Sequence, residues 1–164
     1  LPFFGTAGCS DAKFCDAQAA TEAALQIFSS AAIGSSLVHD CSSWLDHGSL
    51  VSPAFMVLVN EILHNVNQFM KGLPVTEETL ALDVIDRVGP GGHYLQDDHT
   101  LNHFKEVRYS KLFERMVYDQ WKETGAKRFE DRLRELTREA MEHQPAPLAP
   151  EVIKELDQMQ KNWS

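Results

Sequence analysis

Three histidines lie within the stretch VGPGGHYLQDDHTLNHF, which runs from Val88 to Phe104. The second and third, His99 and His103, are four residues apart, so a helix would place both imidazoles on one face. This spacing suits zinc, which protein sites bind tetrahedrally through His and Cys. A zinc site normally has three or four ligands, however, and the acidic HExxH pattern is absent. We therefore favour structural roles, with zinc bound by His93, His99 and His103 as the alternative.

The glycines of the same stretch predict a turn. The run GPGG at positions 89–92 has neither the GxGxxG spacing of a dinucleotide site nor the lysine of a phosphate-binding P-loop. It is typical of a tight turn after a helix. Asp97 or Asp98 would then cap the following helix, which carries the last two histidines.

A second group of reactive residues lies in two loops, CSDAKFCDAQ and HDCSSWLDHGSLVS. Their charged and aromatic members are Asp11, Lys13, His39, Asp40, Trp44, Asp46 and His47. Opposite charges beside an aromatic ring are typical of a pocket for a small polar molecule. The alternative is a set of helix caps and salt bridges, which we favour for Asp16 and Gln18 because they open a helix. For His39 and Asp40 both interpretations stay open.

Trp44 and Cys41 are the remaining candidates in these loops. Trp44 is suited to one wall of an aromatic cage for a quaternary ammonium, an attraction worth roughly 0.5 to 2 kcal/mol, or to a buried anchor of its loop. Cys41 stands near His39 but in no motif that marks an activated thiol. Because no Ser, His and acid arrangement is recognisable either, we do not expect nucleophilic catalysis by this chain.

The elements that position these loops form a strand, helix and strand. A buried strand is predicted at Phe3–Ala7, a helix at Ala17–Ile33 with Asp16 as its N-cap and Gly34 at its end, and a second strand at Ser35–His39. Such a crossover makes the two strands parallel. Their carboxyl ends, and therefore both loops, should meet at one edge, where parallel α/β proteins bind ligands.

Helices dominate the remainder of the chain. Amphipathic spacing and end signals predict helices at Pro53–Lys71, from a Thr76 cap to Gly89, at Tyr118–Thr124, at Lys127–His143 and from Pro150 to Asn162. Charged residues are sparse before position 75 and dense after it. The first part is therefore expected to form the interior, and the second part to cover it or to face a partner.

Composition excludes several functions. The chain has 164 residues, 43% of them hydrophobic, which is enough for one globular core. Its net charge of −9 argues against a nucleic-acid partner, which would require a basic face. Apolar runs are too short for a membrane span, so we expect a soluble, cytoplasmic protein. The cysteines, Cys9, Cys15 and Cys41, are odd in number and are expected to be reduced.

The beginning of the chain also carries an expectation. The sequence starts at Leu1 without a methionine and enters the first strand at once, which we interpret as a cut end. Open edges of a parallel sheet promote association. If the chain exists in this form, we expect it to form a homo-oligomer that covers those edges.

Four segments carry a family resemblance: SDAKFCDAQAATE, WLDHG, TEETLALDVIDRVGPGGHYLQDDHTLNHF and PAPLAPEVIKELDQM. Together they resemble the C-terminal part of the trimethylamine methyltransferase family, whose members include glycine betaine methyltransferases without pyrrolysine. The third segment, Thr76–Phe104, is highly specific. The likeness covers nearly the whole chain.

The resemblance implies an α/β fold that is the C-terminal part of a TIM (β/α)8 barrel. Residues 1–52 would supply its last βα units, and residues 53–164 a mostly helical region packing on the barrel. Members of this family move a methyl group from a methylated amine to the cobalt of a corrinoid. The corrinoid belongs to a separate protein, so this chain is expected to bind no cofactor tightly.

The resemblance also implies roles for the strand-end residues. Trp44 would cage the ammonium, Asp40 would favour a cationic substrate, and Lys13 or His39 would hold a substrate carboxylate, with Asp11 as a further substrate-binding residue. Pyrrolysine, which trimethylamine-specific members carry, is not seen here, which favours a quaternary amine such as a betaine. The glycine turn and its histidines match the family as well, with docking of the corrinoid protein as an alternative to a structural role. The rival interpretation of the whole chain is a docking module without enzymatic activity.

Overall fold

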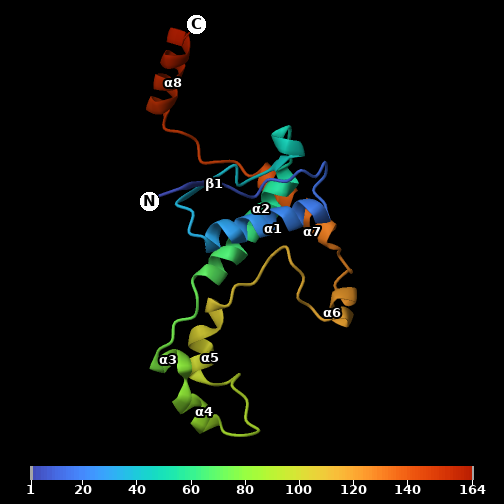
Figure 1. Ribbon diagram of the computed structural model, residues 1–164, viewed down its shortest axis with the longest axis vertical. Helices are drawn as coiled ribbons and strands as arrows, with labels where there is room; N and C mark the ends of the chain where they lie inside the picture. Colours follow the sequence, from blue (N-terminus) through green and yellow to red (C-terminus); the bar gives the residue numbers. More distant parts are fainter. Residues whose placement is uncertain (1, 164) are drawn as a thin grey trace.

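The computed structural model describes residues 2–163, which form an α/β structure of small sheets and many helices (Figure 1). The strands are β1 (Phe4–Thr6), β2 (Leu37–His39), β3 (Trp44–Leu45) and β4 (Leu50–Val51). The α-helices are α1 (Ala17–Ala32), α2 (Pro53–Met70), α3 (Glu77–Leu80), α4 (Leu82–Val88), α5 (Asp98–His103), α6 (Tyr118–Glu123), α7 (Phe129–Glu142) and α8 (Pro150–Trp163). Two 3-10 turns, η1 (Asp46–Gly48) and η2 (Phe104–Glu106), complete the set. The predicted α/β class is confirmed.

The predicted crossover of strand, helix and strand is present. β1 and β2 pair in parallel, with Thr6 opposite His39 in the last register position. The prediction that the first strand is buried is wrong, because Phe4 is 63% exposed. A parallel strand is buried when neighbours cover both its edges and faces, and within residues 2–163 β1 pairs with β2 alone.

Helix α1 begins and ends where its end signals predict. The Asp16 carboxylate accepts hydrogen bonds from the backbone N–H groups of Gln18 and Ala19 at 3.0 and 3.1 Å. Gly34 follows the helix in the left-handed region, at φ +75°, which costs glycine little. These two end signals therefore set the length of the helix that connects the two parallel strands.

The core lies where α1, α2 and α7 pack together. Ala19 and Ala23 on α1 are fully buried and have small side chains, so the neighbouring helix can approach closely. From α2, Phe55 is buried completely, which stabilises the fold by about 1.5 to 3 kcal/mol relative to an exposed ring. Leu133 is the buried contribution of α7. The helices predicted at Pro53–Lys71 and Lys127–His143 are confirmed as α2 and α7, although Phe69 and Met70 at the end of the α2 stripe are exposed.

A short hairpin replaces the second predicted loop. β3 and β4 are antiparallel, with Leu45 opposite Leu50, and η1 connects them. Two-residue strands are too short to show an alternating pattern. The turn places Asp46 and His47 at φ 49° and 53°, a conformation that non-glycine residues seldom adopt. The sequence therefore predicted only a loop.

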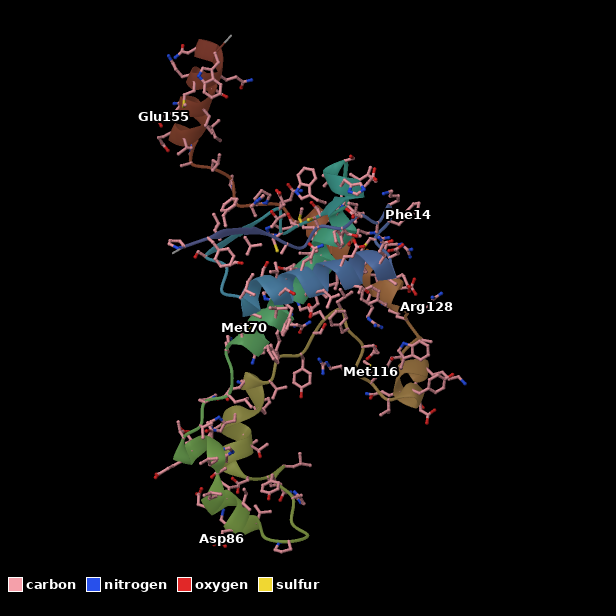
Figure 2. The ribbon with its side chains drawn as sticks, in the orientation of Figure 1. Phe14, Met70, Asp86, Met116, Arg128 and Glu155 are labelled. Atoms are coloured by element: carbon pink, nitrogen blue, oxygen red, sulfur yellow. The ribbon has the colours of Figure 1, made fainter. Side chains whose placement is uncertain are left out.

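Helices α3, α4 and α5 form a lobe that projects away from the core (Figure 1). The chain enters it just after Met70 (Figure 2). The single helix predicted from Thr76 to Gly89 is wrong, because Ala81 lies at φ 49° and divides it into α3 and α4. Alanine favours a helix interior, so local propensity conceals this break. The kink accompanies burial of Val84, which is 5% exposed.

The other predicted helices are present with small changes at their ends. The Asp97 carboxylate caps α5 by accepting from the His99 N–H at 3.0 Å, and Arg87 donates to the same carboxylate at 2.7 Å. α8 stands apart from the core at the end of an extended connector (Figure 1). Within residues 2–163, no helix has both the length and the apolar character needed to cross a membrane.

An ion pair fastens the chain to the core where it returns from the lobe. The Arg108 guanidinium donates to both carboxylate oxygens of Glu61, at 2.7 and 3.0 Å, and to the Asn65 side-chain oxygen at 2.9 Å. Glu61 lies on α2 and is only 7% exposed. Hydrogen bonding to Arg108 holds the pKa of Glu61 below its usual value despite the opposing effect of burial.

Replacing Arg108 with methionine should destabilise the protein strongly. The carboxylate of Glu61 would stay buried without its partner, a loss of about 3 kcal/mol in the free energy of unfolding. Urea denaturation measures this loss. Arg128→Met is the matched control, because Arg128 is 76% exposed and its pair with Glu130 is 3.6 Å long. A loss below about 1 kcal/mol for Arg108→Met would contradict the role given to this pair.

Candidate functional site

A cavity of about 610 Å³ opens at the carboxyl ends of β1 and β2. Its lining residues are Cys9, Ser10, Asp11, Glu22, Gln26, Asp40, Trp44, His47 and Gly48. They come from the loop after β1, from one side of α1, and from the segment between β2 and β4. The volume lies in the range of sites for small ligands. The sequence predicted this edge as the site.

Backbone hydrogen bonds join the two loops that form the cavity walls. The Ser10 N–H donates to the carbonyl oxygen of Trp44, and the Asp46 N–H donates to the carbonyl oxygen of Ala12, both at 3.0 Å. Each loop thus satisfies polar backbone groups of the other. The position of Trp44 is consequently fixed by its main chain, with its ring in the cavity lining.

An ion pair and a His–Asp contact join the same loops through side chains. Lys13 contacts Asp46 at 2.7 Å, and His47 Nδ1 contacts Asp11 Oδ1 at 2.9 Å. The hydrogen bond from Lys13, together with its charge and that of His47, lowers the pKa of Asp46, while burial opposes the shift. Lys13 also donates to the carbonyl oxygen of Asp11 at 2.8 Å. Both of these contacts of the Lys13 ammonium are with groups of the cavity wall.

Helix α1 supplies the third side of the cavity. The Glu22 carboxylate accepts from the Ser10 hydroxyl at 2.6 Å, from the Asp11 N–H at 2.9 Å and from the Gln18 side-chain amide at 2.7 Å. These donors lower the pKa of Glu22, the Ser10 hydroxyl having the largest effect. Further along the helix, the Gln26 side-chain oxygen lies 3.7 Å from the Cys9 sulfur.

Sequence reasoning missed the contribution of this helix to the site. Gln18, Glu22 and Gln26 recur every four residues and so form a polar row on a helix that is otherwise rich in alanine. That row was the available signal. Ser10 and Cys9 carried no recognisable signal, because single small residues in a loop occur everywhere.

At the end of β2, His39 and Asp40 form a pair of their own. His39 Nδ1 lies 2.7 Å from Asp40 Oδ2, and its Nε2 lies 3.0 Å from the Thr6 hydroxyl on β1. The His39 ring also stacks on Phe4, with ring centroids 4.5 Å apart. Both imidazole nitrogens are thus engaged on the sheet, and Asp40 alone of this pair lines the cavity.

The loop after β2 contains strained backbone. Among residues 2–163, four of the six non-glycine residues with positive φ are Asp40, Ser43, Asp46 and His47. Each such conformation costs of order 1 kcal/mol or more, and surrounding contacts must maintain it. Strain of this kind gathers at ligand sites. The loop geometry therefore supports a functional role for this edge.

Close approach of the two strand ends requires glycine at position 8. Gly8 has φ +80°, and a Cβ there would lie 3.0 Å from the Cys41 sulfur. Partial burial of Cys41 raises the pKa of its thiol, with Cys9 adding to the effect. A thiol with a raised pKa is a poor nucleophile at neutral pH, which supports the expectation that Cys41 is not activated.

The five predicted substrate-binding residues all lie at this edge, in two different positions. Asp11, Asp40 and Trp44 line the cavity. Lys13 and His39 lie beside it, engaged with Asp46 and with Asp40 respectively. Asp46 and His47 belong to the same cluster, and His47 lines the cavity. Their roles toward a substrate stay predictions.

The three histidines of the lobe do not converge on a metal site. The rings of His99 and His103 lie with centroids 4.3 Å apart. His99 Nε2 lies 2.9 Å from the carbonyl oxygen of Glu78, and His103 Nδ1 lies 2.8 Å from Glu106. In the part of the chain that the structure describes, no group of three potential ligands is placed to hold a metal. The GPGG run forms a turn after α4, as predicted.

The lining of the cavity is acidic. Among the described lining residues, Asp11, Glu22 and Asp40 supply carboxylates, and neither lysine nor arginine is present. His47 is the basic member. Together with Trp44, this lining favours a small cation.

Comparison with known proteins identifies the family of this chain. Residues 1–162 match the family described as trimethylamine methyltransferase (MTTB). The chain belongs to this family. The resemblance read from the sequence segments is therefore confirmed.

Similar proteins in the trimethylamine methyltransferase family include enzymes named for different amines. The trimethylamine methyltransferase MttB of Desulfitobacterium hafniense is 36% identical over 93% of this chain, and the glycine betaine methyltransferase of the same species is 33% identical over 74% of it. A trimethylamine methyltransferase MttB of Methanosarcina thermophila is 29% identical over 95% of it. The chain spans only 31%, 26% and 32% of these three relatives.

Removing the Lys13 ammonium tests whether the Lys13–Asp46 ion pair joins the two loops of the cavity wall. In Lys13→Met the pKa of Asp46 should rise toward its ordinary value, about 4, as measured by carboxyl NMR titration. Because Asp46 has a lowered pKa in the folded protein, its contribution to stability is present above that ordinary value and is lost as pH falls through the folded pKa. The substitution should therefore lower stability at pH 7, and its effect should vanish in strong acid.

Lys71→Met is the control for this experiment. Lys71 carries the same charge but contacts the neutral side chain of Gln68, at 3.4 Å. It should leave the pKa of Asp46 unchanged. If Lys13→Met also leaves it unchanged, the Lys13–Asp46 pair does not join the two loops.

Proposed function

We propose that this protein transfers a methyl group from a methylated or quaternary amine to the cobalt of a corrinoid carried by a separate protein. The observation that supports the proposal most is the small cavity at the strand ends, acidic and aromatic, in a chain of the trimethylamine methyltransferase family. The cavity volume of about 610 Å³ suits the amine. The corrinoid, in this proposal, is a co-substrate that supplies the nucleophile.

The cavity would receive the ammonium end of the substrate. Asp11 and Asp40 supply negative charge, and the half-buried Trp44 ring offers a face worth about 0.5 to 1 kcal/mol to a cation. Lys13 and His39 are tied to Asp46 and to Asp40, so a substrate carboxylate at this wall would have to displace an existing pair. The wall therefore favours recognition of the cationic group that all candidate amines share.

Such a site can promote the reaction by positioning. The C–N bond breaks with its electron pair going to nitrogen, so a quaternary ammonium or a protonated tertiary amine leaves as a neutral amine, and the new bond to carbon uses two electrons from the acceptor. This balance requires no protein nucleophile and no general base. The residues of this chain need only hold the cation and aim its methyl group outward.

The fold agrees with this chemistry if β1, α1 and β2 belong to a TIM barrel. We infer that residues 1–52 supply βα units of such a barrel and that the helices of residues 53–164 pack on it. Active sites of TIM barrels lie at the carboxyl ends of the strands, which is where this cavity opens. The exposed edge and faces of β1 and β2 would then be covered by further barrel strands or by another copy of the chain.

The proposal is tested with the protein expressed from its complete reading frame. It is mixed with cob(I)alamin and, in separate reactions, with trimethylamine, glycine betaine, carnitine or proline betaine, and the cobalt spectrum is followed. We expect conversion to methylcobalamin with at least one amine. Asp40→Asn should lower kcat/KM about tenfold or more through the lost charge. Asparagine tolerates the positive φ of this position, so the loop should keep its shape.

Asp86→Asn is the matched control, since Asp86 is exposed on α4 in the lobe (Figure 2). It removes the same charge and should leave kcat/KM unchanged. No spectral change with any amine from a folded protein would contradict the proposed reaction. Equal losses for both variants would contradict the role given to Asp40.

A further inference from the structure

Glu22 is the one carboxylate of the cavity that lies on a helix rather than on a loop. It stands in the second turn of α1 and is half-buried. All its hydrogen bonds with residues 2–163 come from donors: Oε2 accepts from the Ser10 hydroxyl and the Asp11 N–H, and Oε1 accepts from Gln18. A carboxylate used only as an acceptor must be ionised, and these same bonds lower its pKa.

Ser10 links Glu22 to the loop after β1. Its side chain is almost completely buried, with the residue 4% exposed. Its hydroxyl donates to Glu22 at 2.6 Å and accepts from the Ala12 N–H at 3.0 Å. Glu22 therefore holds the loop at three successive residues, two of them directly and Ala12 through the serine hydroxyl.

Asp11 connects Glu22 to His47 in the opposite wall of the cavity. Its backbone N–H is held by Glu22, while its carboxylate Oδ1 lies 2.9 Å from His47 Nδ1. With Asp11 ionised, the proton of this hydrogen bond lies on Nδ1 of the imidazole. The Nε2 atom of His47 is then the nitrogen left for the cavity. Glu22, Asp11 and His47 thus form a chain of contacts from the rigid helix to the strained turn of the hairpin.

We propose that Glu22 is a positioning residue: it fixes Asp11, and through Asp11 the tautomer and orientation of His47, in the cavity wall. This inference rests on the proposed function insofar as the wall receives a methylated amine. Glu22 can hold the loop in place because it lies on α1, and a helix packed in the core moves less than a loop. The cost of replacing Glu22 should appear in ligand binding and in the state of His47, in addition to a loss of global stability.

The variant Glu22→Gln tests the proposal in the protein expressed from its complete reading frame. Glutamine keeps the size but replaces one acceptor oxygen with a donor group, which faces the Ser10 and Asp11 donors or Gln18. We expect the Kd for tetramethylammonium, measured by calorimetry, to rise about tenfold. In ¹⁵N spectra of histidine-labelled protein, the His47 signal, assigned with His47→Asn, should lose Nδ1–H character. The melting temperature should fall, because the hydrogen bonds that lower the pKa of Glu22 also stabilise the folded protein at pH 7.

Glu155→Gln is the control of equal charge change, on α8 far from the cavity (Figure 2). It should alter neither the Kd nor the His47 spectrum. If Glu22→Gln fails to fold, Ser10→Ala removes the links to Ser10 and Ala12 but keeps the Asp11 N–H bond to Glu22, and it should shift the His47 tautomer in the same direction by a smaller amount. An unchanged His47 spectrum in the folded variant would overturn the proposal.

The two readouts separate this inference from the proposed function. If the unmodified protein does not bind tetramethylammonium, the proposed substrate class is contradicted, while the His47 spectrum still tests the positioning role. Suppose instead that the unmodified protein binds tetramethylammonium and that Glu22→Gln changes the Kd without changing the His47 spectrum. Glu22 then acts only through its charge, and the positioning role is contradicted.

Discussion

The parallel pairing of β1 with β2 across α1 determines where the chemistry of this chain can lie. Parallel register places Thr6 beside His39, so both following loops start at the same edge. Gly8 permits the backbones to stay close there, because a side chain at that position would meet the Cys41 sulfur. Every residue of the cavity depends on this arrangement, since the loops that carry Asp11 and Trp44 would otherwise start from separate parts of the fold.

The cavity wall combines backbone strain with dense polar contacts, and these contacts maintain the strained conformation. Positive φ angles in the segment 40–47 are costly by themselves, yet they aim Asp40 and His47 at the edge where the loops meet. The ties from Lys13 to Asp46 and from Asp11 to His47 supply contacts that hold this conformation. Glu22 anchors the other loop to the helix. The proposed cation binding and the preorganisation of the wall thus draw on the same acidic side chains.

Much of the architecture was predictable because it rests on local signals. The Asp16 cap, the Pro53 start and the stripe of α7 lie in short stretches of sequence, and each marks an element that the structure contains. The break at Ala81 and the hairpin at Trp44 depend on positive φ at residues that seldom adopt it, which no local pattern reveals. At the site, Asp11, Asp40 and Trp44 were recognisable as loop residues at strand ends. Glu22 was not, because its place in the cavity wall follows from hydrogen bonds to residues more than ten positions away.

The central claim is that the cavity at the strand ends binds a methylated ammonium ion. The most direct test is a titration of the ¹⁵N-labelled protein with trimethylammonium, observed in amide and indole NMR spectra. We expect saturable shifts of the Trp44 indole N–H and of backbone amides in the segments 9–12 and 40–48, with the lobe of α3, α4 and α5 unaffected. Saturable shifts confined to the lobe, or none at any concentration of the amine, would contradict it.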